Sequence, residues 1–274
     1  MFFKGSKDEF IEIFNFSSKI IKEKQKDSII VMAGAAGMFP ENKKFWKYAL
    51  PKIKDNFDIA NIHHISTPDG KCDKEFWVDE FSSLLKTANI NKPIWVTESA
   101  NLHSTDQSMT DAANYIKWML RGFNDGGMTA YMMHLFYEEA DAGGYSSLVA
   151  WDENGTIILP KRYHAFKHFS NLIKKGYRVI DSQTIEGDIM VGSFISPDQT
   201  KIIIQLFNEG DSQDFSIDVP IGATNVSHYV TSNTENTNFS IYNDISFDIG
   251  SRYTSINIPP MSLHSVIYTI DPSA

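Results

Sequence analysis

The chain has 274 residues, which is enough for one large domain or two ordinary ones. Hydrophobic residues make up 42% of it and aromatic residues 13%, which excludes a disordered chain. The net charge is -9 and no segment gathers Lys and Arg, so nucleic acid is not an expected partner. No run approaches the ~18 apolar residues that a membrane span needs.

Up to about residue 175, amphipathic helices alternate with short apolar runs. The predicted helices cover 10–21, 45–53, 76–85, 111–120 and 161–176. The predicted strands between them are 27–34, 57–65, 92–99 and 126–136. Apolar strands that are each followed by a helix predict a parallel sheet covered by helices.

After Gly176 the hydrophobic period changes to two. Seven or eight short strands follow, separated by turn signals such as Pro-Asp, Asn-Glu-Gly and Gly-Ala. This pattern predicts an antiparallel β-sandwich. We therefore expect an α/β domain over 1–176 and a β-sandwich domain over 177–274.

Distinctive residues follow each strand of the predicted parallel sheet. They are Gly34 to Gly37 after the first strand, His63 and His64 on the second, Glu98 on the third, and His134, Phe136 and Tyr137 after the fourth. Active sites of parallel α/β folds form at the carboxyl ends of the strands. For each residue alone, a surface, capping or core role is the simpler interpretation, but together they indicate a site.

Four segments resemble, in order, the second half of the clan A glycoside hydrolases, in particular β-xylosidase-like members with an appended β-sandwich. They are "FDIANIHHI", "KPIWVTES", "GGMTAYMMHLFY" and "SSLVAWDENGTIILPKRYHAF", and the resemblance covers about residues 8 to 175. It implies the C-terminal half of a (β/α)8 TIM barrel, strands five to eight, followed by the sandwich. In the family, strand six carries an Asp and, five residues on, a His, as Asp58 and His63 do here.

The resemblance implies roles for residues at these strand ends. Glu98 matches the catalytic nucleophile of a retaining glycosidase, and His63 is expected to orient it. The residues expected to contact an oligo- or polysaccharide or glycoside substrate are His64, His134, Phe136, Tyr137 and Trp151. The resemblance implies no cofactor and no metal, and it suggests a secreted or cell-surface enzyme, although Met1 to Gly5 lack a signal-peptide pattern.

The sequence departs from the family pattern at three places. A Tyr expected two residues after the His is Ile65, and an aromatic platform is replaced by Met132 and Met133. The acid/base Glu belongs to strand four, which has no counterpart here. We therefore expect the C-terminal part of a longer enzyme, or a chain that pairs with a missing N-terminal half or a second copy. Glu138 is the in-chain candidate for the acid/base.

Other motifs allow alternative interpretations. "VMAGAAG" resembles a phosphate loop but lacks the first glycine of the dinucleotide motif. His63, His64 and Cys72 have no usual metal-ligand spacing, and "DGKCDKE" and "DENG" are shorter than a calcium loop, the latter being typical of a hairpin turn. The main functional rival is a non-catalytic carbohydrate-binding or structural relic of a glycosidase.

Overall fold

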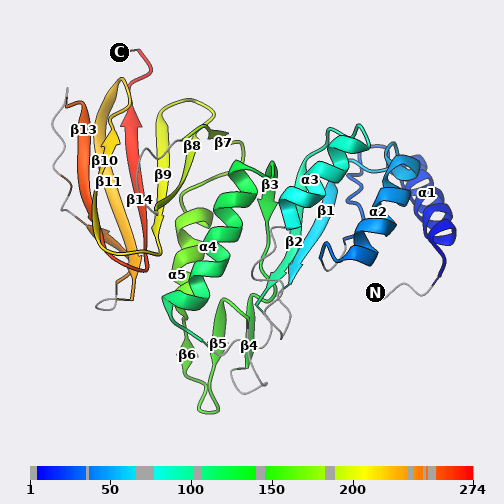
Figure 1. Ribbon diagram of the computed structural model, residues 1–274, viewed down its shortest axis with the longest axis horizontal. Helices are drawn as coiled ribbons and strands as arrows, with labels where there is room; N and C mark the ends of the chain where they lie inside the picture. Colours follow the sequence, from blue (N-terminus) through cyan, green and yellow to red (C-terminus); the bar gives the residue numbers. More distant parts are fainter. Residues whose placement is uncertain are drawn as a thin grey trace. The chain divides into compact units, whose positions relative to one another are not determined.

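The computed structural model describes residues 5–34, 37–65, 77–101, 106–139, 146–182, 189–233, 237–242, 245 and 251–273. The chain forms two compact units (Figure 1). The first comprises Met1–Ser104, Arg121–Glu138 and Ala142–Ser147, and the second comprises Thr105–Leu120, Glu139–Asp141 and Leu148–Ala274. The unit boundary passes through a helix, α4 (Met109–Asn124). A domain boundary at residue 176 stays a prediction.

The first unit begins with three helices and a parallel sheet. The helices are α1 (Lys7–Lys24), α2 (Pro40–Ile53) and α3 (Trp77–Thr87), and the strands are β1 (Ala60–Ile65), β2 (Ile94–Ala100) and β3 (Met128–Tyr131). The strand order is β1-β2-β3, with both pairs parallel. The helices and the inner residues of β1 and β2 share one apolar core, which includes Trp46, Leu50, Phe81, Ile62 and Val96.

Local sequence explains where the first two helices begin. Ser6 and Glu9 form a capping box at α1: the Ser6 Oγ accepts from the Glu9 amide at 3.2 Å, and Glu9 Oε2 accepts from the Ser6 amide at 2.6 Å. Pro40 opens α2, where its missing N–H is not needed. Neither start requires tertiary contacts.

The predicted strand 27–34 is reduced to a single parallel bridge, Val31 with Ile59. The carboxylate of Asp58 accepts the Ile30 amide at 2.7 Å, so a side chain takes a bond that a ladder would otherwise make. The Met32 amide donates to the Ile59 carbonyl at 2.9 Å, which keeps this segment beside β1. Ile29, within this segment, is 65% exposed.

The second unit contains the predicted antiparallel strands. They are β7 (Arg178–Ile180), β8 (Ile189–Ile195), β9 (Lys201–Asn208), β10 (Gln213–Asp218), β11 (Ala223–Ser232), β12 (Asn238–Tyr242), β13 (Tyr253–Ile258) and β14 (Ser262–Ile270). Six of them form one sheet in the order β12-β11-β14-β9-β8-β7, and β10 pairs with β13. Residues of both sheets, among them Leu206, Ile217, Ile258 and Val266, build one core, as a sandwich requires.

The helix α5 (Lys161–Ser170) also belongs to the second unit, where it packs on the six-stranded sheet. The fully buried ring of His168 contacts Ser265 Oγ at 2.5 Å and Thr231 Oγ1 at 2.9 Å. Ser265 donates to Gln205 Oε1, and Gln205 Nε2 donates to the backbone carbonyl of His168 at 2.8 Å. The helix is therefore held through both its ring and its backbone.

Two sets of interacting polar side chains are also buried in this unit. Arg162 and Asp111 form an ion pair with a 2.7 Å contact, and their side chains are 0% and 1% exposed. On the other face of the sheet, His264 Nε2 meets Ser262 Oγ at 2.9 Å and His264 Nδ1 meets His228 Nε2 at 2.8 Å. Each of these side chains has a polar partner, which offsets the cost of its burial.

Three short strands follow β3 along the chain: β4 (Tyr137–Glu139), β5 (Val149–Trp151) and β6 (Ile157–Ile158). The strands β5 and β6 form an antiparallel hairpin whose turn is "DENG". Asp152 Oδ1 accepts the amides of Asn154 and Thr156, and Gly155 has a φ of +77°. The predicted hairpin is confirmed. None of the described helices has the length and apolar character to cross a membrane.

Candidate active site

Glu98 and His63 lie side by side near the carboxyl ends of β2 and β1. The two residues are register partners in the parallel ladder, and His63 Nδ1 is 3.3 Å from Glu98 Oε2. Both side chains are partly accessible, at 23% for His63 and 30% for Glu98. The structure thus brings together the two residues that the strand-end pattern predicts to be neighbours.

A bulge in β2 determines the direction of Glu98. The register pairs Ile62 with Val96 and then His63 with Glu98, so Thr97 is an extra residue in β2. Thr97 Oγ1 donates to Asn61 Oδ1 at 2.7 Å, and Asn61 lies two residues before His63, on the same face of β1. Consecutive residues of β2 therefore both reach this face. Bulges are frequent next to active sites because they redirect a side chain.

His134 is the third member of this strand-end cluster. Backbone bonds continue the β2–β3 pairing past Tyr131: the Met132 amide donates to the Val96 carbonyl and the His134 amide to the Ser99 carbonyl at 2.9 Å. The imidazole of His134 is close enough to His63 to lower the pKa of His63. Its Nδ1 is buried and has no hydrogen-bond partner among the residues that the structure describes.

The pKa of His63 is lowered from its ordinary value chiefly because its ring is partly buried. The carboxylate of Glu98 acts in the opposite direction, and His134 adds to the lowering. His63 is therefore neutral at neutral pH. A neutral imidazole has one N–H, and a proton on Nδ1 would lie on the nitrogen that is 3.3 Å from Glu98 Oε2.

Glu138 is engaged elsewhere. Its Oε1 accepts the backbone amide of Ser147 at 3.0 Å. This bond holds the carboxylate against the backbone at Ser147, and Ser146 in turn donates to the His134 carbonyl at 2.9 Å. This bond uses one carboxylate oxygen of Glu138, and a general acid would have to reach the leaving oxygen with the other.

Phe136 and Tyr137 form an exposed aromatic pair after β3. Their side chains are 65% and 62% exposed, and their rings meet edge to face with centroids 6.3 Å apart. Exposed aromatic rings on one segment offer a surface for stacking. Trp151 lies in β5 of the second unit, where it pairs with Ile157.

His64 does not line the accessible face. It alternates with His63 along β1, and it is 1% exposed. Contact with a substrate would require β1 to open, so we assign His64 to the core. Among the described residues, no group of three or more His, Cys, Asp and Glu could hold a metal ion. Cys72 and the whole of "DGKCDKE" lie outside the described residues, as do Ala35 and Ala36.

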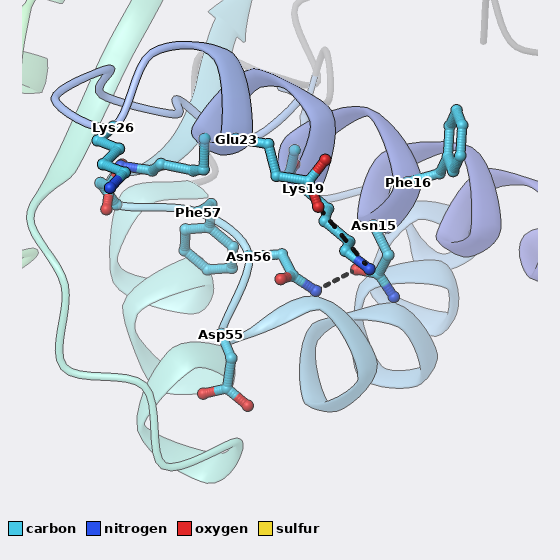
Figure 2. A pocket seen from close by; sticks show the side chains of 11 residues that line it. Asn15, Phe16, Lys19, Glu23, Lys26, Asp55, Asn56 and Phe57 are labelled. Carbon is cyan, nitrogen blue, oxygen red and sulfur yellow. Dashed lines mark hydrogen bonds and ion pairs between the residues drawn. The ribbon is translucent and has the colours of Figure 1, made fainter.

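A separate cavity of about 640 Å³ lies between α1 and the connection from α2 to β1 (Figure 2). Asn56 donates to Asn15 across it at 2.8 Å. Three lysines and three carboxylates share its lining, so their charges offset each other. None of the predicted site residues lines this cavity.

Sequence reasoning placed Gly34 at a strand end of the site but did not identify Thr97 or Asn61 as neighbours of the site. The polar Thr97 between Val96 and Glu98 was the available signal for an irregular strand end. Gly34 lies against the His63 ring, a contact between segments that no local pattern in the sequence indicates.

No model of a known protein family matches the sequence, and no curated protein matches it. Several solved structures do. A family 30 endoxylanase from Clostridium papyrosolvens has a TM-score of 0.71 at 17% identity, covering 97% of this chain and 61% of that chain. An α-L-arabinofuranosidase from Thermotoga maritima has a TM-score of 0.68 at 13% identity, covering 97% and 63%.

A family 44 endoglucanase from a Clostridium species is also similar, with a TM-score of 0.65 at 11% identity over 96% of this chain and 61% of that one. At such identities the likeness establishes the fold alone. The chain spans about three fifths of the length of the solved structures it matches. Over nearly its whole length, this chain has the fold found in glycoside hydrolases of families 30 and 44 and in an α-L-arabinofuranosidase.

Proposed function

We propose that this chain carries the nucleophile half of a retaining glycoside hydrolase site, with Glu98 as the nucleophile and His63 as the residue that orients it. The observation that carries the proposal is the contact between His63 Nδ1 and Glu98 Oε2 at the carboxyl end of a parallel strand. Donation from a neutral imidazole leaves one carboxylate oxygen free to attack. It also fixes the rotamer of Glu98, which an attack along a single line requires.

In the first step a Glu98 oxygen bonds to the anomeric carbon of the sugar, and the bond from that carbon to the leaving oxygen breaks. The leaving oxygen keeps the bonding electron pair and, in a complete enzyme, takes a proton from a second carboxyl group about 5–5.5 Å away. Glu138 is the candidate within this chain, with one oxygen bound to the Ser147 amide. Because the chain covers 61% of the matched endoxylanase, we propose that the proton donor comes from the part of that fold which this chain does not cover.

Two features outside the carboxylate fit a sugar substrate. The edge-to-face pair of Phe136 and Tyr137 supplies exposed rings for stacking on a sugar face. His134 is proposed as a further substrate contact, since it lies beside His63 at the same strand ends. Trp151 is proposed as a further stacking residue. The endoxylanase and the α-L-arabinofuranosidase among the matched structures suggest xylosides and arabinofuranosides as first substrates to test.

An apolar face on α1 supports the idea of a missing part. Ile13, Phe16 and Ile20 follow a helical spacing and are 56%, 66% and 39% exposed, although α1 already buries a different face through Ile11 and Ser18. The matched structures are longer than this chain by about two fifths of their length. We propose that a segment corresponding to that remainder covers this face.

The covering segment is tested by hydrogen exchange. Whatever coding sequence precedes Met1 is expressed together with the chain, and the amides of 7–24 are compared with those of the 274-residue chain alone. Slower exchange in the longer protein supports a covering segment. Equal exchange in the two proteins contradicts a covering segment. Protection that rises with the concentration of the 274-residue chain alone also contradicts it, because it indicates that a second copy covers the helix.

The proposed nucleophile is tested by covalent trapping, because an excellent leaving group needs no general acid. The chain is incubated with 2,4-dinitrophenyl 2-deoxy-2-fluoro-β-xyloside and with the corresponding glucoside, and its mass is followed. We expect a single sugar adduct that maps to Glu98 and is absent from Glu98→Gln. Glu139 is another carboxylate, on β4, and Glu139→Gln is the matched control that should still form the adduct. Saturable binding of xylo-oligosaccharides without any adduct would favour the carbohydrate-binding relic instead.

A further inference from the structure

Gly34 lies directly against the ring of His63. A Cβ atom added to Gly34 would be 2.5 Å from His63 Nε2 and 2.6 Å from His63 Cδ2. It would also be 3.0 Å from Asn61 Nδ2. Real Cβ atoms essentially never approach other atoms below 3.0 Å, so any residue but glycine has to displace the imidazole.

The backbone does not explain this glycine. The φ angle of Gly34 lies outside the left-handed region, where glycine is favoured for its freedom, whereas Gly127 and Gly176 lie inside it with φ of +68° and +93°. An alanine could adopt the backbone of Gly34. What glycine provides at this position is space for the imidazole.

The two sides of the His63 ring therefore have different neighbours. Nδ1 faces the carboxylate of Glu98 at 3.3 Å, and the edge with Nε2 and Cδ2 faces Gly34. We propose that Gly34 is a positioning residue, which lets the His63 ring take the one orientation in which Nδ1–H donates to Glu98. Its importance for catalysis rests on the proposed function, whereas the placement of the ring does not.

A methyl group at position 34 would displace side chains on the face of β1 that Thr97 and Glu98 reach. Restoring an ordinary contact of 3.4 Å requires the ring to move by about 1 Å, which is enough to lengthen the bond to Glu98. The same methyl group presses on Asn61, whose Oδ1 accepts from Thr97 beside Glu98. Displacements of this size near a reacting group reduce rates by about 100-fold.

The first test reads the hydrogen bond directly. Nitrogen NMR of the histidine rings in the 274-residue chain should show His63 with its proton on Nδ1, a signal assigned by its loss in His63→Gln. In Gly34→Ala we expect this Nδ1–H signature to be lost or replaced by the Nε2–H form. Gly122→Ala is the matched control, because its Cβ meets the flexible end of Met128 at 2.9 Å, and it should leave the His63 signature unchanged.

The second test works even if Gly34→Ala folds poorly. Removing the ring removes the obstacle, so the fall in unfolding midpoint caused by Gly34→Ala should largely disappear in the His63→Ala background. A double variant that loses as much stability as the two single changes together would overturn the inference. So would a Gly34→Ala protein with an unchanged His63 Nδ1–H signature.

The trapping rate separates this inference from the proposed function. If the wild-type chain forms the Glu98 adduct, Gly34→Ala should form it about 100-fold more slowly. An unchanged rate contradicts a positioning role for Gly34. If the wild-type chain forms no adduct, the proposed function fails, while the NMR signature and the double variant still decide where the ring lies.

Discussion

Thr97 and Glu98 are consecutive residues of β2, yet both side chains reach the face of β1 that carries Asn61 and His63. In a regular strand they would point to opposite faces. The bulge at Thr97 is therefore what allows a buried, apolar strand to end in a carboxylate that faces a histidine.

Removal of the Thr97 hydroxyl should weaken this arrangement. Thr97→Val keeps the shape of the side chain but leaves the Oδ1 of Asn61, a residue that is 7% exposed, without its donor. We expect a loss of about 1–3 kcal/mol in the free energy of unfolding, measured by urea titration. The control is Thr87→Val, which removes an exposed hydroxyl bonded to the Ser83 carbonyl and should cost less than about 0.5 kcal/mol. Equal losses in both variants would contradict a special role for Thr97.

Breaking the buried ion pair of Arg162 and Asp111 should lower the free energy of unfolding more than Thr97→Val does. Arg162→Met leaves Asp111 charged in surroundings where its side chain is 1% exposed, so we expect a loss of about 3–5 kcal/mol in unfolding free energy. The double variant Arg162→Met/Asp111→Leu should recover part of this loss, because no unpaired charge remains. Lys117→Met breaks the accessible pair with Glu209 and serves as the control, with a cost of about 1 kcal/mol or less. A double variant as unstable as Arg162→Met would show that the pair is not the cause.

The buried histidines predict lower stability at mildly acidic pH. Ser262 Oγ donates to the Pro259 carbonyl, so His264 must donate from Nε2, and its Nδ1 accepts from His228. His264 therefore has no free nitrogen for a second proton, and burial lowers its pKa to about 3. The pKa of His168 is likewise held well below its ordinary value by burial.

These histidines are neutral when folded and bind a proton near pH 6.5 when unfolded. The unfolded state thus binds more protons between their two pKa values, and stability falls as the pH falls through this window. From about pH 7.5 to about pH 5.5, each histidine should contribute a loss of about 1.4 kcal/mol. His264→Gln should reduce the slope of stability against pH by the share of one histidine. An unchanged slope would refute the assignment.

Glu138→Gln distinguishes a half-site from a complete one. We expect the 274-residue chain to turn over aryl glycosides with poor leaving groups slowly or not at all, because the proposed proton donor is missing. Glu138→Gln should not change that rate, and it should not change adduct formation from dinitrophenyl glycosides. Turnover is measured by release of the phenol, with light scattering to give the mass of the species. Robust turnover by a monomer that Glu138→Gln abolishes would mean that the site is complete within this chain.

Much of the fold could be predicted from the sequence because local patterns determine it. The apolar run before Glu98 and the period of two after Gly176 predict a buried strand and a sandwich, and the structure contains both. The proximity of His63 and Glu98 follows from parallel strands whose carboxyl ends share one edge. The bulge at Thr97 depends on the pairing register of two strands, which the residues of one strand do not determine.

Other differences also come from tertiary contacts. Ile13 and Ile20 have the helical spacing of core residues, but they are exposed because α1 buries another face. The sequence pattern of 27–34 predicts a strand. In the structure this segment makes one bridge to Ile59, and the Ile30 amide donates to the Asp58 side chain instead of to a neighbouring strand. The space that His63 occupies beside Gly34 exists only once 31–34 lies along β1.

The hydrogen bonds that hold His168 of α5 to β9 and β14 have a consequence for engineering the second unit. Because β9 and β14 hold the carbonyl and the ring of the same residue, His168, the helix cannot slide by a residue or rotate without losing bonds to both strands. The hairpin turn at residues 152–155, which precedes α5, should therefore accept inserted residues without shifting the helix. It offers an attachment point for a label or an affinity handle that leaves the sandwich undisturbed.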